Sequence, residues 1–172
     1  MSDATNSHDP PEGDSEKFLA FQKKAKAANL NEQTLLATDY LNHFNEIVMT
    51  IEMIPDMPEL LEEAREWRPK SYQDHFRDST FAGKDMAIEA YEYVPARYRT
   101  PFEANIAAIN RFIAMTVKNA EDAVASGDND RLRLLMTDAS HSIQKIMDMA
   151  SANIHGSEHA LDQAEVDALL GV

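Results

Sequence analysis

Two long segments with helical periodicity, separated by a very short turn, constrain the fold of this 172-residue chain more than any other feature. Apolar residues recur at spacings of three and four over about 101–126 and again from Asp128 to about Ile154. Gly127 can end the first helix and Asp128 can cap the second. At about 1.5 Å per residue, each arm would be roughly 39 Å long. The pattern predicts an all-α fold: an elongated antiparallel helical bundle with a long C-terminal helical hairpin.

The first arm is expected to begin at Thr100-Pro101-Phe102-Glu103. Thr100 and Glu103 fit a capping box, and Pro101 would occupy the first helical position. Phe112 and Met115 lie off the apolar seam of this arm. They can pack on another helix of the same chain or on a second subunit. The sequence therefore leaves open whether the bundle is completed within the chain or as a homodimer.

A polar tail and several shorter helical patterns precede the hairpin. Residues 1–14 are rich in Ser, Asp, Pro and Gly, so a disordered tail is expected. A helix is expected from Ser15 to about Ala28, and Asn31 is expected to cap a longer one that Pro55 stops. The apolar seam of this longer helix consists of Ala37, Tyr40, Phe44, Ile47, Ile51 and Ile54. Prolines divide the next part of the chain into short helices near 58–67, from Ser71, and over about 84–93.

The chain is strongly acidic, with 16 Lys and Arg against 30 Asp and Glu and a formal net charge of −14. It lacks the cationic excess that phosphate binding needs, so no nucleic acid partner is expected. The Tyr and Arg residues of 91–99 are therefore interpreted as a packed corner with cation–π contacts, not as a site for single-stranded nucleic acid.

Several kinds of site and location are not expected. The chain has no Cys, no basic and apolar leader and no run of about 18 apolar residues, which favours a cytoplasmic protein without a membrane partner. No Gly-rich phosphate loop or cluster of metal ligands occurs, so neither a cofactor nor a metal is expected. His43 has no second His at i+3 or i+4 and is interpreted as a residue at the boundary of the core.

The last twelve residues form a second distinctive pattern. Asp162 can cap a helix while Glu165 reaches back to it, and Leu161 can pack on Val166. A narrow apolar stripe follows at helical spacing: Val166, Leu169 and Leu170. Polar and acidic residues flank this stripe: Gln163, Glu165 and Asp167. No Lys or Arg follows Lys145, so this helix suits a basic partner surface, unless it folds back onto its own bundle.

This terminal pattern resembles two families of bacterial chemotaxis. Leu-x-Gln-Ala-Glu-Val-Asp-Ala-Leu-Leu resembles the peptide at the start of the flagellar switch protein FliM, and Asp-Gln-x-x-Val-Asp-x-Leu-Leu resembles the C-terminus of the phosphatase CheZ. In both families the peptide docks as a short helix on the phosphorylated response regulator CheY. The resemblance implies that a CheY-like regulator is bound by Leu161, Asp162, Gln163, Glu165, Val166, Asp167, Leu169 and Leu170.

The sequence departs from CheZ where catalysis is concerned. In that family a bundle helix carries Asp-x-x-x-Gln, whose Gln orients the attacking water, and this pattern does not occur here. Gln144 has Ser140 one turn before it and Asp148 one turn after it. Because positioning a water needs only one amide, Gln144 remains a catalytic candidate. His141 is also expected to face solvent, but it lacks a phosphotransfer pattern around it and is interpreted as part of a solvated face.

The sequence thus predicts four parts: a tail over 1–14, a helical bundle domain over 15–155, a hinge over 156–161 and a docking helix over 162–172. The leading hypothesis is a chemotaxis or flagellar-control protein that binds a CheY-like response regulator through the docking helix. The alternatives are a CheZ-type phosphatase, which would hydrolyse the phosphoryl group of the regulator, and a structural helical module whose last helix closes its own bundle.

Overall fold

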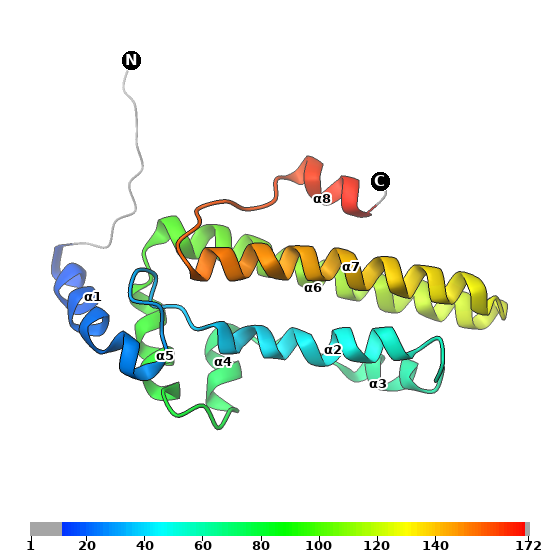
Figure 1. Ribbon diagram of the computed structural model, residues 1–172, viewed down its shortest axis with the longest axis horizontal. Helices are drawn as coiled ribbons and strands as arrows, with labels where there is room; N and C mark the ends of the chain where they lie inside the picture. The colour runs from blue at the N-terminus through cyan, green and yellow to red at the C-terminus, as the bar shows by residue number, and fades with distance from the viewer. Residues whose placement is uncertain (1–11, 171–172) are drawn as a thin grey trace, which may run out of the picture.

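The computed structural model describes residues 12–170, apart from the side chains of residues 12–14, Gln163 and Leu170. This part of the chain is all-helical, as predicted, and contains no strand (Figure 1). Its α-helices are α1 (Glu12–Ala25), α2 (Asn42–Met53), α3 (Leu60–Glu66), α4 (Tyr72–Arg77), α5 (Lys84–Ala90), α6 (Ala96–Ser126), α7 (Asn129–Ile154) and α8 (Gln163–Leu170). Three short 3-10 helices join them: η1 (Lys26–Ala28), η2 (Thr38–Leu41) and η3 (Tyr91–Tyr93). None of the helices described is long and apolar enough to cross a membrane.

The predicted hairpin is confirmed by α6 and α7, which pack along their lengths (Figure 1). Gly127 ends α6 in the left-handed conformation, with φ of 72°, and its N–H donates to the carbonyl of Val124 at 3.1 Å. Asp128 caps α7 by accepting from the N–H of Arg131 at 3.0 Å. The turn follows from these two residues, because glycine tolerates positive φ and Asp satisfies a free N–H.

The start of α6 differs from the prediction. The helix begins at Ala96, so Thr100 does not cap it and Pro101 lies inside it. The carbonyl of Pro95 accepts from the N–H groups of Tyr98 and Arg99, each at 2.9 Å. Pro101 has no N–H, so it leaves the carbonyl of Arg97 without its usual helical partner. The helical turn before Pro101 is tolerated because only one backbone hydrogen bond is lost.

The helix predicted from Asn31 is wrong over its first part. Asn31 caps a turn instead, since its side-chain oxygen accepts from the N–H groups of Gln33 at 2.8 Å and Thr34 at 3.0 Å. Leu35 then takes a φ of 64°, which no α-helix allows. From Asn42 the prediction is confirmed by α2, whose buried seam includes Phe44, Ile47 and Ile51.

Beyond the hairpin, α2 provides a third long helix that packs against α7, while α3 packs against α2 and α6. Ion pairs mark both contacts: Arg133 of α7 meets Asp56 just after α2 at 2.5 Å, and Arg65 of α3 meets Glu121 of α6 at 2.8 Å. The helices α2, α3, α6 and α7 thus pack together within the chain.

The remaining short helices gather at the end of the hairpin opposite its turn (Figure 1). The predicted corner at 91–99 is packed, with the guanidinium of Arg97 4.9 Å from the ring centre of Tyr98 and that of Arg99 6.0 Å from Tyr91. The helix predicted from Ser15 begins three residues earlier, at Glu12, and residues 1–11 of the predicted tail lie outside the described part. Ser71 caps α4 through Asp74.

Candidate functional site

The helix α8 forms the candidate site, and its start is set by its own sequence. The N–H of Glu165 donates to the carboxylate of Asp162 at 2.8 Å, and the N–H of Asp162 donates to the carboxylate of Glu165 at 2.8 Å. This reciprocal pair is the predicted capping box, which satisfies two N–H groups that a helix start leaves unpaired. Both acidic side chains are exposed.

The apolar stripe of α8 lies against the chain's own hairpin. Val166 is 4% exposed and belongs to the core, and half-buried Leu161 and Leu169 pack against that core. Leu169 lines a cavity of about 260 Å³ together with Phe112 and Met115 of α6 and residues of α7. The two α6 residues that the sequence left unassigned, Phe112 and Met115, thus lie beside Leu169 of α8.

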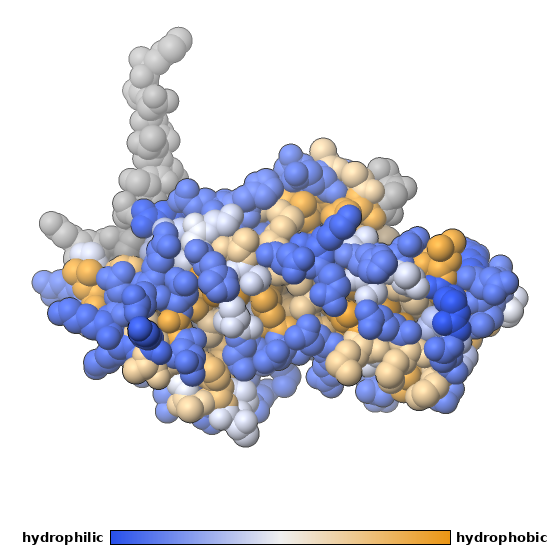
Figure 2. Space-filling model, in the orientation of Figure 1, coloured by the Kyte–Doolittle hydropathy of each residue, from blue (hydrophilic) through white to orange (hydrophobic). Residues whose placement is uncertain are grey.

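The structure describes only some of the side chains of the other predicted binding residues of α8. Asp167 is half-buried. Gln163 and Leu170 belong to α8, but their side chains lie outside the described residues. In Figure 2 hydrophilic residues cover most of the visible face, and hydrophobic residues show where α8 meets the hairpin.

A buried pair of asparagines fastens the segment that leads to α8. Asn105 of α6 and Asn153 of α7 are both fully buried, and the amide of Asn105 donates to the side-chain oxygen of Asn153 at 2.6 Å. The amide of Asn153 donates to the carbonyls of Ser157 at 2.9 Å and His159 at 2.8 Å. The oxygen of Asn105 accepts from the N–H of Leu161 at 3.1 Å. The predicted hinge over 156–161 is therefore held on the bundle by this pair.

The asparagine pair was missed from the sequence, although a signal for it was present. Asn105 lies three residues after Phe102 and four before Ile109, on the apolar side of α6, and Asn153 follows Ala150 by three residues. A polar residue in an apolar seam needs a hydrogen-bond partner. Two such residues at the same end of a hairpin are expected to hydrogen-bond to each other.

Gln144 lies on another face of α7. Its side chain is exposed, as are those of His141 and Asp148. Nine residues at about 100° each place Gln144 roughly 180° around the helix from Leu135, which lines the cavity under α8. Ser140, one turn before Gln144, is buried and donates its hydroxyl to Glu52 of α2. In this arrangement the catalytic candidate faces away from the docked helix.

His43 occupies the interior of the bundle end. It is 8% exposed, and its Nε2 accepts from the N–H of Lys70 at 2.9 Å. Its ring stacks on that of Trp67, with 4.8 Å between the ring centroids. Burial, with smaller effects of His75 and Lys70, lowers its pKa to about 4. The imidazole is therefore neutral and satisfied. Within the described residues, no group of three His, Asp or Glu side chains could hold a metal.

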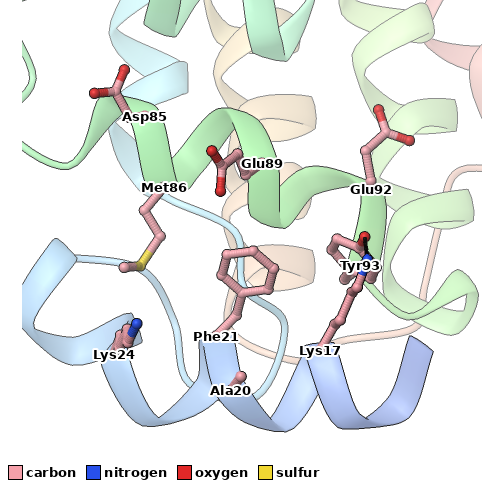
Figure 3. A pocket seen from close by; sticks show the side chains of 9 residues that line it. All are labelled: Lys17, Ala20, Phe21, Lys24, Asp85, Met86, Glu89, Glu92 and Tyr93. Atoms are coloured by element: carbon pink, nitrogen blue, oxygen red, sulfur yellow. Dashed lines mark hydrogen bonds between the residues drawn. The ribbon is translucent and has the colours of Figure 1, made fainter. Parts of the chain in front are cut away.

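A second concave surface lies between α1 and α5, and sequence reasoning gave no sign of it (Figure 3). This surface, the α1–α5 groove, has a volume of about 800 Å³. Its apolar floor consists of Ala20, Phe21, Met86 and Tyr93. The residues come from segments about 65 positions apart, so no local pattern could reveal the groove.

The chain matches no protein-family model, no curated protein and no solved structure. Any functional assignment therefore depends on the residues and geometry of the chain itself.

Proposed function

We propose that this chain is a chemotaxis or flagellar-control protein that captures a CheY-like response regulator through α8. The observation that carries the proposal is the construction of α8 itself. It is a short helix with its own capping box and a narrow apolar stripe, joined to the hairpin by a connecting segment. Such a helix suits a groove on a partner, as in other cases of helix-in-groove recognition.

The charge of the terminal segment supports the same proposal. No Lys or Arg follows Lys145, whereas the segment contains Glu158, Asp162, Glu165 and Asp167. Opposite charge on a regulator surface would speed encounter at low ionic strength and fix the orientation of the helix.

Capture requires α8 to leave its own bundle, because Val166 cannot be buried in two places at once. A protein whose binding-competent form is a fraction of the population binds with an apparent Kd raised by the inverse of that fraction. The intact chain should therefore bind a regulator more weakly than the isolated terminal peptide does.

The test is a titration of a peptide of residues 157–172, and of the intact chain, against CheY-like regulators with and without a phosphoryl mimic. The peptide is expected to bind, to bind more tightly than the intact chain, and to lose binding when Val166 is replaced by Asp. A peptide with Ala168, which is exposed, replaced by Ser is the matched control. If neither the peptide nor the intact chain binds any regulator, the proposal is wrong.

The hydrolytic alternative is supported by one observation, the exposed amide of Gln144 on the long hairpin. If the chain is a phosphatase, it should accelerate phosphate release from a phosphorylated regulator, and Gln144→Ala should abolish the acceleration without changing binding. Lys145→Ala, an exposed neighbour, is the control. An unchanged release rate with the original chain would exclude catalysis and leave capture intact.

The structural alternative is favoured by the burial of Val166 in the core. In that case the peptide would bind no regulator, while removal of residues 163–172 would lower the free energy of unfolding of the bundle. Peptide binding and bundle stability therefore separate the two functions of α8.

A further inference from the structure

The α1–α5 groove has an apolar floor to which α1, α5 and η3 contribute. The rings of Phe21 and Tyr93 stack at 5.4 Å, and Met86 lies beside them (Figure 3). A neighbouring cavity of about 430 Å³ shares the lining residues Lys24, Asp85 and Met86 with the groove. From Gly83 to Tyr93 the helical rise of about 1.5 Å per residue gives a length of roughly 15 Å. This length fits a segment of polypeptide better than a compact small molecule.

The two walls of the groove carry opposite charges. On the α1 wall, Lys17 and Lys24 are seven residues apart, and Lys17 donates across the groove to the hydroxyl of Tyr93 at 3.1 Å. On the other wall, Asp85 and Glu89 of α5 are four residues apart, and Glu92 follows in η3. Spacings of seven and four residues place the two lysines along one side of α1 and the first two carboxylates along one side of α5. Figure 3 shows the lysines projecting from α1 and the carboxylates from α5 and η3.

This combination matches one side of a coiled-coil interface. An apolar seam there is flanked by charged residues at heptad spacing, and these charges select the partner helix. In the groove, Phe21 and Met86 supply the seam, while the lysines and carboxylates supply the flanks.

We propose that the α1–α5 groove seats an amphipathic helix of a partner protein. The seated helix carries an apolar residue every three to four positions, acidic residues on the edge that faces α1 and basic residues on the edge that faces α5. This interaction is independent of the capture of a regulator by α8.

The charges of the walls exclude α8, of this chain or of a second copy, as the occupant. An occupant needs cations for Asp85, Glu89 and Glu92, and the chain has no Lys or Arg after Lys145. The floor also argues against a purely ionic ligand, because Phe21 and Met86 would then remain in contact with water.

The experiment uses three designed helical peptides of about three heptads with one apolar seam and different flanks: one edge acidic and one basic, both acidic, or both basic. Each is titrated against the full chain by NMR, with shifts at Phe21 and Met86 reporting the site. The mixed-flank peptide should bind at least about tenfold more tightly than the others, and the difference should shrink as salt screens the flanks.

Two charge-reversal variants test whether each wall selects the charge of the peptide edge that faces it. Lys24 and Glu89 are exposed, so reversing either charge leaves the core unchanged. Lys24→Glu should shift preference toward the all-basic peptide, and Glu89→Lys toward the all-acidic peptide. Lys118→Glu, at an exposed site on α6, is the control and should change neither preference. The proposal is overturned if no peptide binds, if all three bind equally, or if the two variants do not shift preference in opposite directions.

Discussion

Replacing Asn105 with Ala should release α8 from the bundle. The Asn105 amide donates to the side-chain oxygen of Asn153 at 2.6 Å and to the carbonyl of His159 at 3.3 Å, and its oxygen accepts from the N–H of Leu161 at 3.1 Å. All three interactions disappear with the side chain. The segment before α8 then keeps its contacts with Asn153 but loses those with α6.

The size of the effect follows from the groups left without partners. Losing the partner of a buried N–H or carbonyl costs about 1–3 kcal/mol. The N–H of Leu161 is the main group affected in the connecting segment, so the opening of α8 should become easier by about that amount. A change of about 1–3 kcal/mol corresponds to roughly a 5- to 150-fold increase in the opening equilibrium. The orphaned oxygen of Asn153 adds a separate destabilisation of the hairpin.

Hydrogen exchange on the intact chain measures this opening directly, because local unfolding sets the exchange rate of each amide. In Asn105→Ala the amides of residues 166–169 should exchange roughly 5- to 150-fold faster. Amides in the middle of α6 and α7 should exchange faster only to the extent that the hairpin itself is destabilised. Asn45→Ala, at an exposed site on α2, is the matched control. If exchange in α8 is unchanged while the hairpin amides exchange faster, the asparagine pair stabilises the hairpin alone and the reasoning about α8 is refuted.

Three further predictions concern the stability of the bundle. Burial and the neighbouring His75 lower the pKa of His43 from 6.5 to about 4. The unfolded chain therefore binds a proton that the folded chain excludes, and up to about 3 kcal/mol of stability, present above pH 6.5, should be lost as the pH falls toward 4. Urea unfolding at several pH values tests this, and His43→Gln should flatten the dependence. Gly127→Ala should lower the free energy of unfolding by about 1 kcal/mol, because Gly127 has a φ of 72°, although an added Cβ meets no atom within 4 Å. Gly83→Ala should lower the free energy of unfolding more than Gly127→Ala does, because the added Cβ would lie 2.5 Å from the carbonyl oxygen of Ala28. Thermal melts of the two variants test this order.

The long elements were predictable because local signals decide them. Gly127 and Asp128 specify the turn of the hairpin by their own conformational preferences, whatever the rest of the chain does. The capping box of Asp162 and Glu165 is local in the same way, and the structure contains it as predicted.

The errors occur where distant contacts decide the local conformation. Leu35 has positive φ and no exposed surface, and next to it the hydroxyl of Thr34 donates to the carbonyl of Ile154 at 2.6 Å, 120 residues away. The start of α6 is similar, because the hydroxyl of buried Tyr98 accepts from the amide of Gln33 at 2.7 Å. A sequence pattern read within one helix cannot include such partners.

For the same reason, the helix of the candidate site was predictable from the sequence but its position on the bundle was not. The sequence specifies α8 as a helix with an apolar stripe, but the position of α8 depends on Asn105, Asn153 and the side of α6 that contains Phe112. The α1–α5 groove depends wholly on which helices meet. Contacts between distant segments thus decide both where α8 is held and whether the α1–α5 groove exists.

Fewer buried side chains attach α8 to the bundle than attach α2. Of the α8 side chains that the structure describes, Val166 alone is buried, whereas α2, all of whose side chains are described, buries six. An isolated helix of eight residues is unstable in water, so α8 depends on its capping box and on an apolar surface that covers its stripe. Either its own hairpin or a partner can supply that surface. Val166, half-buried Leu161 and Leu169 and the asparagine pair anchor α8, so its release should cost less free energy than the release of α2 with its six buried residues.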